Sequence, residues 1–375
     1  MAPRIRPELI REFAAELGFE LVRFGPADLG GQESRFLSWI DQGRHGDMEW
    51  LREHREVIAD PQRFAPGARS TISLAHDYGG PSIELPSGGR IARYASGRDY
   101  HRVLGKALRK LRERLESEGL PHGSVHIGTD AVPVLERALA VQSGLGFLAK
   151  SAGVISPTHG PYLLLAEALV PAELPLDLPS PGSCGSCTRC IDACPTDAIV
   201  QPFEVDARRC ISHATIESRG PIPESMRENL GDWLFGCDVC LEVCPFTSKS
   251  PAPNTPRTDW HAPHRAVQRY DLVQVLELDQ AAWDADWTGT PIRRATRDGL
   301  RRNAAIVLGN RREERALPAL RKALEDPSAL VREHAAWAIH RMNPNDPQLR
   351  NRCRTEQHPR VLAALDGRSA ESEID

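Results

Sequence analysis

The first half of the chain alternates between helical and strand patterns of apolar residues. An amphipathic helix is predicted over residues 7–18, because its apolar side chains share one face: Leu9, Ile10, Phe13, Ala14 and Leu17. Further helices are predicted over about 32–43, 100–117 and 133–143, and strands over 19–24, 71–75, 124–127, 153–156 and 162–169. Strands that alternate with helices are typical of an α/β domain, here of about 170 residues.

The last part of the chain contains an internal repeat. Residues 300–309 (LRRNAAIVLG) align with residues 331–340 (VREHAAWAIH), and residues 316–324 supply a helix between them. Helix pairs whose stacked faces are apolar and small are typical of a HEAT-like solenoid, here about two units long. A plain helical cap is the alternative. Proline-rich stretches at 171–181 and 251–263 are predicted linkers on either side of the middle of the chain.

The bulk composition is that of an ordinary soluble protein. The 375 residues carry a net charge of −4, with 41% hydrophobic and 26% charged residues. We see neither a signal peptide nor an uncharged apolar stretch of the roughly 20 residues that span a membrane, so we expect a cytoplasmic protein without membrane contact. Positive charge is concentrated over residues 293–315, which contain eight arginines but only three acidic residues, Asp298, Glu313 and Glu314. An anionic partner is expected to dock there.

Eight of the nine cysteines lie within residues 184–244. The first four follow C-x2-C-x2-C-x3-C-P, the bacterial ferredoxin spacing, whose fourth cysteine serves the other cluster of a pair. If the last cysteine of each group binds the cluster of the other group, two [4Fe-4S] clusters are predicted. One is bound by Cys184, Cys187, Cys190 and Cys244, and the other by Cys194, Cys210, Cys237 and Cys240. This module is expected to move electrons at low potential.

Two zinc sites or a disulfide framework are the alternatives for these eight cysteines. Zinc ribbons do not normally need this spacing, and a disulfide scaffold fits neither the length of the chain nor the clustering of its cysteines. The ninth, Cys353, stands alone and is expected to be packed or inert.

Several longer motifs carry a resemblance to a known family. They are HGDMEWL at 45–51, RYASGRDYH at 93–101, TDAVPVLER at 129–137, GLGFLAK at 144–150, CISHATIE at 210–217, RGPIP at 219–223 and GCDVC at 236–240. With the cysteines and the repeat, they make the chain closely resemble the epoxyqueuosine reductases, over about residues 5–340. Members of that family use cobalamin and are related to the reductive dehalogenases.

The resemblance implies a fold of three parts. An α/β corrinoid-binding catalytic domain (1–175), nitroreductase-like as in reductive dehalogenases, precedes a ferredoxin-like domain with two [4Fe-4S] clusters (176–250). A connecting segment (251–290), HEAT-like repeats (291–368) and a disordered tail (369–375) follow. The implied activity is reduction of epoxyqueuosine to queuosine at the wobble position of tRNA, the last step of queuosine biosynthesis. A reductive dehalogenase-like corrinoid enzyme and a ferredoxin-type electron carrier are the alternatives. The implied partners are tRNA and a low-potential donor such as flavodoxin or ferredoxin, and we expect a monomer.

Asp130 is the candidate proton donor. It lies between a predicted strand end and a predicted helix start, and strand ends in α/β domains commonly face the ligand crevice. From the pattern alone an N-cap of the helix is the better interpretation, but the resemblance reverses this preference. An acid at neutral pH needs a raised pKa, which we expect from burial against an apolar corrin face. Arg137 could hold the substrate or the aspartate, and an exposed helical arginine is the alternative.

The resemblance also implies the remaining contacts. Cobalamin contacts are expected from Tyr94, Arg98, Asp130, Lys150, Ser151, Ser212, Arg219, Cys237 and Asp238. Ser212 could equally well orient a cluster loop. Residues 99–105 are similar to a cobalt-ligating D-x-H-x-x-G motif, but the glycine comes one residue late, so His101 is interpreted as a helix-start residue. Cobalamin is therefore expected base-off, without a histidine ligand. Contacts with tRNA are expected from Arg293, Arg294, Arg297, Arg301 and Arg302.

Overall fold

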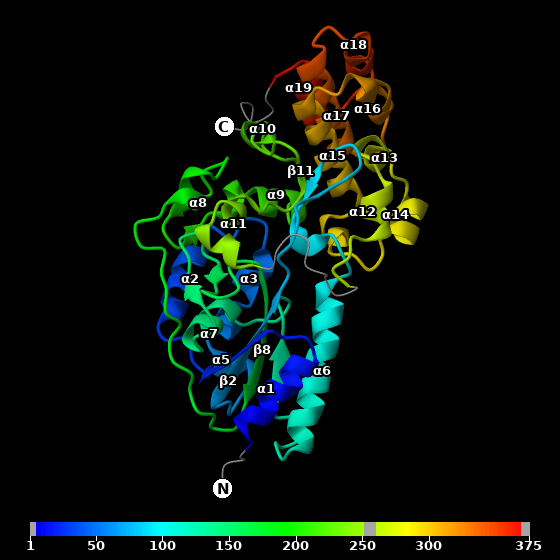
Figure 1. Cartoon of the computed structure of the whole chain (residues 1–375). Helices are drawn as coiled ribbons and strands as arrows, with labels where there is room; N and C mark the ends of the chain where they lie inside the picture. Colours follow the sequence, from blue (N-terminus) through cyan, green and yellow to red (C-terminus); the bar gives the residue numbers. More distant parts are fainter. Residues whose placement is uncertain (1–4, 251–259, 369–375) are drawn as a thin grey trace. The chain divides into compact units, whose positions relative to one another are not determined.

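The structure is a computed structural model that describes residues 5–250 and 260–368 (Figure 1). The chain divides into two compact units. Unit 1 comprises Met1–Pro81, Asp99–Ala207 and Val239–Pro256, and unit 2 comprises Ser82–Arg98, Arg208–Asp238 and Arg257–Asp375. Most of the predicted linker at 251–263 and the whole predicted tail at 369–375 lie outside the described residues.

Unit 1 is built from a central sheet and helices that range from one turn to the long α6. Its helices are α1 Pro7–Glu16, α2 Gln32–Asp41, α3 Glu49–Glu53, α4 Arg55–Ile58, α5 Pro61–Phe64, α6 Tyr100–Ser117, α7 Glu136–Gln142, α8 Arg189–Asp192 and α11 Val239–Glu242. Its strands are β1 Leu21–Pro26, β2 Ser70–Asp77, β5 His126–Gly128, β6 Phe147–Leu148, β7 Val154–Ile155, β8 Leu163–Val170, β9 Ile199–Gln201 and β10 Glu204–Val205. The predicted helices and strands of the first half are thus present, with ends that differ by a few residues.

The central sheet has the order β1-β2-β8-β5, and all of its neighbouring strands are antiparallel. Both faces are covered, because nearly every residue of β2 and β8 is buried. Helix α7 packs on one face through Leu139 and Ala140, and α1 and α6 lie on the other side of the sheet (Figure 1). Strand β5 pairs with β8 so that Gly128 stands opposite Glu167. The chain leaves the sheet there, two residues before Asp130.

Helix α6 begins and packs for reasons that are visible in its sequence. The carboxylate of Asp99 caps the helix by accepting the backbone N–H of His101. Behind this cap, four leucines spaced by three or four residues form one buried stripe: Leu104, Leu108, Leu111 and Leu115. The cap and the stripe together place Tyr100 and His101 at a fixed end of a rigid helix.

Unit 2 contains the repeat and a small sheet. Its helices are α9 Ile211–Ile216, α10 Glu224–Arg227, α12 Arg265–Arg269, α13 Leu272–Leu276, α14 Gln280–Asp286, α15 Arg297–Arg311, α16 Leu317–Ala323, α17 Ala329–Met342, α18 Pro347–Cys353 and α19 Pro359–Leu365. Its sheet has the order β11-β4-β3, with β11 Trp233–Phe235, β4 Arg90–Ile91 and β3 Ile83–Glu84.

The two aligned repeat segments form the cores of α15 and α17, which pack closely against each other. A Cβ atom on Gly309 would stand 2.8 Å from the Trp337 ring and 3.0 Å from the backbone of Ala338. The small residue is therefore required by the close approach of the two helices. Among the described residues, no helix combines the length and the apolar character that crossing a membrane requires.

Candidate active site

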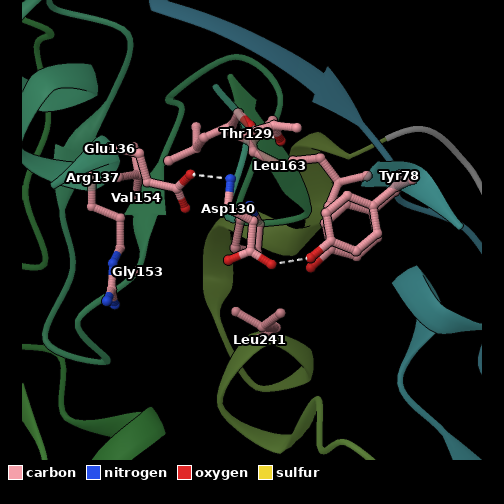
Figure 2. A pocket seen from close by; sticks show the side chains of 13 residues that line it. Tyr78, Thr129, Asp130, Glu136, Arg137, Gly153, Val154, Leu163 and Leu241 are labelled. Atoms are coloured by element: carbon pink, nitrogen blue, oxygen red, sulfur yellow. Dashed lines mark hydrogen bonds between the residues drawn. The ribbon is translucent and has the colours of Figure 1, made fainter. Parts of the chain in front are cut away.

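A hollow opens in unit 1 where β5 ends and β8 begins (Figure 2). Its lining combines apolar side chains with a group of ionisable ones, which includes Tyr100, Asp130, Glu136 and Arg137. Asp130 does not cap the following helix, because α7 begins at Glu136 and has no side-chain cap. The N-cap alternative for Asp130 is therefore wrong, and its carboxyl group is available for other contacts.

The carboxyl group of Asp130 meets two side chains from the start of α6. The hydroxyl of Tyr100 donates a hydrogen bond to Oδ2 of Asp130, and Nε2 of His101 lies 3.0 Å from the same oxygen. On its other side, Nδ1 of His101 lies 2.9 Å from Oδ1 of Asp99. One imidazole thus stands between two carboxylates. The Asp130 side chain keeps 54% of its surface exposed, because it faces the hollow.

The charges of Asp99, His101 and Asp130 determine which of these side chains is protonated. Burial opposes the charge of His101, but the hydrogen bonds and the negative charges of Asp130 and Asp99 raise its pKa to about 9. Burial also opposes the charge of Asp130, but His101 and Tyr100 outweigh it and hold the pKa of Asp130 below its usual range. The raised pKa that was expected for Asp130 against a corrin face stays a prediction. At neutral pH the proton of the pair resides on His101.

Glu136 stands directly behind Asp130 and had no sequence signal of its own. Its Oε2 atom accepts the backbone N–H of Asp130 over 2.9 Å (Figure 2). Burial and the neighbouring charge of Asp130 raise the pKa of Glu136 to about 7. A second carboxyl, that of Glu167 on β8, accepts a hydrogen bond from Ser73 over 2.7 Å, and burial holds its pKa well above the usual value.

Arg137 points away from the Asp130 carboxyl toward the turn near Gly153 (Figure 2). Its guanidinium donates to the carbonyl of Ala152 over 2.8 Å. In this position it contributes positive charge that lowers the pKa of Asp130 without contacting it. A direct contact of Arg137 with the substrate stays a prediction.

Four thiols of unit 1 lie close enough to influence one another. Burial, together with the charges of Cys184 and Cys187, raises the pKa of both Cys190 and Cys244. Cys184 and Cys244 also pack on the same apolar cluster of Phe147, Ala149 and Ile155. These four are the cysteines expected to share the first cluster. Within the described residues, no three His, Cys, Asp or Glu side chains are arranged to hold a single metal ion.

Lys150 is tied to the loop that carries the first thiols. Its ammonium group donates to the carbonyls of Gly185 and Cys187, each over 2.9 Å, and its backbone N–H donates to the sulfur of Cys184 over 3.4 Å. The structure thus shows Lys150 orienting the cysteine loop, and its contact with cobalamin stays a prediction. Ser151, the next residue, is half-buried in the same turn.

The other expected ligands and contacts are divided between the units. Cys194 and Cys240 belong to unit 1, whereas Cys210 and Cys237 belong to unit 2, so the second cluster stays a prediction from the spacing. The remaining expected cobalamin contacts all belong to unit 2: Tyr94, Arg98, Ser212, Arg219, Cys237 and Asp238. Among them, Asp238 is buried and accepts the backbone N–H of Arg93 over 2.8 Å, and Arg219 donates to the carbonyl of Ile216.

The five arginines expected at the tRNA surface fall into two groups in unit 2. Arg293, Arg294 and Arg297 are at least partly exposed, and each meets an acidic side chain: Asp284, Glu217 and Asp298, respectively. Solvent-exposed pairs of this kind are weak, so a phosphate can compete for these guanidinium groups.

Arg301 and Arg302 lie in the interior of unit 2 instead. Arg302 is 0% exposed and donates to the backbone carbonyls of Ala214, Ser218 and Gly220. Arg301 is 7% exposed and pairs with Asp326. The packing of unit 2 thus uses these two cations, and neither presents its guanidinium group to solvent as the expected contact with tRNA would require.

Comparisons with known families match three segments of the chain. Residues 59–130 match the family described as "Epoxyqueuosine reductase QueG, DUF1730", and residues 183–247 match a "4Fe-4S double cluster binding domain". Residues 291–366 match "HEAT repeats". The predicted double-cluster module and the predicted repeat are confirmed by these matches.

Whole-chain comparisons agree. An epoxyqueuosine reductase from Xanthomonas campestris pv. campestris is 40% identical over 338 residues, which cover 88% of this chain and 94% of the relative. A crystal structure of epoxyqueuosine reductase with an epoxyqueuosine-modified tRNA-Tyr stem loop is similar with a TM-score of 0.85 at 28% identity, over 96% of both chains. A Bacillus subtilis epoxyqueuosine reductase, described with an aspartate's catalytic loop swung out of the active site, gives a TM-score of 0.83 at 28% identity, again over 96% of both chains. The chain therefore belongs to the epoxyqueuosine reductase family of oxidoreductases.

Proposed function

We propose that this protein reduces epoxyqueuosine to queuosine at the wobble position of tRNA, the last step of queuosine biosynthesis. The reaction converts an epoxide to an alkene with loss of water, and it consumes two electrons and two protons. The observation that carries the proposal is the Asp130–His101 pair at the unit 1 hollow, in a chain whose relatives are named for this reaction. The tRNA stem loop bound to a similar protein supports tRNA as the substrate.

Asp130 and His101 supply the proton in this proposal. At neutral pH the pair holds one proton, mainly on the imidazole, and Asp130 exposes its carboxyl to the hollow. As negative charge develops on the epoxide oxygen, the proton passes from His101 to Asp130 across the 3.0 Å contact and from Asp130 to the epoxide oxygen. The second proton of the released water comes from solvent. The hydroxyl of Tyr100 holds the shared oxygen in place.

The donor groups of unit 1 fit an iron–sulfur cluster. Four thiols influence one another electrically, two of them pack on one apolar cluster, and a backbone N–H points at the sulfur of Cys184. Hydrogen bonds to sulfur and a nearby cation are recognised means of tuning such clusters. We propose two [4Fe-4S] clusters with the crossed ligand sets, which would supply single electrons from an external donor such as flavodoxin or ferredoxin.

Cobalamin is proposed as the second cofactor, and it would supply a strongly reducing cobalt centre when bound. Both ring nitrogens of His101 already contact carboxylates, which supports the expectation that this histidine is not a cobalt ligand. The proposed contacts in unit 1 are Asp130, Lys150 and Ser151, and those in unit 2 are Tyr94, Arg98, Ser212, Arg219, Cys237 and Asp238.

The proposed tRNA surface is narrower than the expected one. It comprises Arg293, Arg294 and Arg297, whose side chains reach solvent in unit 2. A base in an anticodon loop is already partly unstacked, so the enzyme gains access to it at modest cost. Contacts with the surrounding phosphates then provide most of the affinity.

Nucleoside analysis in cells tests the function. A strain without its epoxyqueuosine reductase accumulates the epoxide in its tRNA, and expression of this chain should restore the alkene. Expression of Asp130→Asn, at equal protein and cluster content, should leave the epoxide in place. Epoxide that persists with the parent protein loaded with both cofactors would reject the proposed function.

A further inference from the structure

The backbone of Asp130 adopts an unfavourable conformation that needs a partner to hold it. Its φ is 53°, in the left-handed region that residues with a Cβ adopt at a cost, although aspartate tolerates it better than most. The loop around this residue contains two tight turns. The N–H of Ala131 donates to the carbonyl of Thr129 over 2.5 Å, and the N–H of Val134 donates to the carbonyl of Val132 over 2.8 Å. A strained loop of this kind persists only where its surroundings fix it.

Glu136 is the side chain that fixes the strained residue. Its Oε2 atom accepts the N–H of Asp130 over 2.9 Å, and Figure 2 shows the carboxyl group pointing at this nitrogen. Glu136 is the first residue of α7, whose Leu139 and Ala140 are fully buried against the central sheet. The acceptor therefore sits on a rigid element, whereas the donor sits on a loop.

We infer that Glu136 is a positioning residue that latches the Asp130 loop in the conformation in which the Asp130 carboxyl contacts His101. The inference deepens the proposed function, on which its catalytic meaning rests. Without the latch, the left-handed residue is free to relax, and its carboxyl leaves the oxygen position that Tyr100 and His101 share. The Bacillus subtilis relative, described with its catalytic loop swung out, supports a loop with two positions.

The neighbourhood of Glu136 favours an acceptor with a modest charge. The negative charge of Asp130 raises the pKa of Glu136, whereas the positive charges of Arg137 and His101 lower it. Glu167 on β8 is close enough that the charge of Glu136 raises its pKa in turn. Burial and the charge of Asp130 bring the pKa of Glu136 to about 7, so the carboxyl is partly neutral under ordinary conditions. The neutral carbonyl of a glutamine side chain should therefore serve as the acceptor of the Asp130 N–H in place of the Glu136 carboxyl.

Three variants separate a latch from an acid or base. Glu136→Gln keeps an acceptor oxygen at the same reach, Glu136→Ala removes it, and Glu136→Asp keeps the charge but shortens the side chain by one methylene. Glu173→Ala is the matched control, since it removes an exposed glutamate of unit 1. Two readouts need neither substrate nor turnover: hydrogen exchange of the Asp130 amide, and the pKa of His101 from NMR titration. All variants are studied as the full chain loaded with iron, sulfide and cobalamin.

We expect the Ala and Asp variants to exchange the Asp130 amide about tenfold faster or more, as loss of a hydrogen bond to a charged group predicts. The pKa of His101 should fall in both toward its ordinary value, because Asp130 no longer faces it. The Gln variant and the Glu173→Ala control should match the parent in both readouts and the Gln variant should retain turnover.

Unchanged exchange and unchanged His101 pKa in both the Ala and the Asp variant would overturn the latch. Loss of turnover in the Gln variant with both readouts intact would also overturn it, and would make Glu136 an acid or base instead. If the parent fails to reduce epoxyqueuosine while the readouts change as expected, the proposed function fails and the latch stands.

Discussion

The Nε2 atom of His101 lies 3.0 Å from the Oδ2 atom of Asp130 and joins the start of a long helix to a strained loop at the end of a strand. The contact raises the pKa of one group and lowers that of the other, so the pair holds one proton across a wide pH range. Asp130 is ionised at neutral pH, but it can still act as a proton donor there, because the neighbouring imidazole of His101 holds the proton that Asp130 passes on.

The first prediction concerns stability and pH. The folded pKa of His101, about 9, exceeds the ordinary value of 6.5, so its contacts stabilise the fold fully below about pH 6.5 and progressively less as pH rises through 9. His101→Gln should therefore be less stable than the parent at pH 6 and converge with it near pH 10. We expect a difference of about 1 kcal/mol at the low end, since 37% of the imidazole side chain is exposed.

Thermal unfolding of both proteins across this pH range measures the effect. His122→Gln is the control, because that imidazole is 98% exposed. A constant difference between parent and His101→Gln at every pH would show that the imidazole is not held protonated by Asp130 and Asp99.

The second prediction separates the two cluster ligand sets. Cys194→Ala should damage the cluster that is also expected to use Cys210, Cys237 and Cys240, and should leave the other nearly intact. Cys190→Ala should do the reverse, because Cys190 lies with Cys184, Cys187 and Cys244. The parent should bind about eight irons and each variant about four. Iron analysis and Mössbauer spectroscopy of each protein provide the count. Zinc without labile sulfide in the parent would contradict the whole assignment.

The third prediction concerns Lys150. Reduction adds negative charge to a cluster, and the Lys150 ammonium lies against the loop between Cys184 and Cys187. Lys150→Met should therefore shift the potential of the first cluster to a more negative value. Redox titration followed by EPR measures the shift, with the exposed Lys110→Met on α6 as the control. Equal potentials in all three proteins would show that the ammonium does not tune this cluster.

The fourth prediction concerns tRNA binding. Arg294→Ala and Arg297→Ala together should raise the apparent KM for tRNA and reduce the slope of log binding constant against log salt by up to about 1.5, as two lost phosphate contacts predict. Arg55→Ala, which removes an exposed arginine of unit 1, should change neither quantity. Binding measured from low to high salt gives the slope. If the double variant binds as the parent does at every salt concentration, these arginines form only a solvated face.

Much of this architecture could be predicted from local patterns. The α6 helix follows from its capped, leucine-striped sequence, and the close pairing of α15 with α17 follows from small residues such as Gly309. The close placement of the four unit 1 thiols that are proposed to share the first cluster follows from the cysteine spacing, because the chemistry of a cubane restricts where thiolates can stand. In each case the determinant lies within one segment or in one well-defined motif.

The remaining features depend on packing between distant segments. Nothing near Asp130 in the sequence shows that the start of α6 meets it and holds its pKa below the usual range. Glu136 carries no local sign that it accepts the Asp130 amide. A count of arginines cannot distinguish Arg302, which backbone carbonyls of unit 2 surround, from Arg294, whose side chain reaches solvent.

The most direct test of the account is single turnover of epoxyqueuosine-containing tRNA by the reconstituted protein under a low-potential reductant, followed by nucleoside analysis. The parent should convert the epoxide to the alkene. Asp130→Asn should load the same iron and cobalamin but react about 100- to 10,000-fold more slowly, as loss of a general acid predicts. Asp41→Asn, which alters an exposed aspartate of unit 1, should react as the parent does. Near-normal turnover by Asp130→Asn would exclude Asp130 as the proton donor, and no alkene from the fully loaded parent would contradict the assigned reaction.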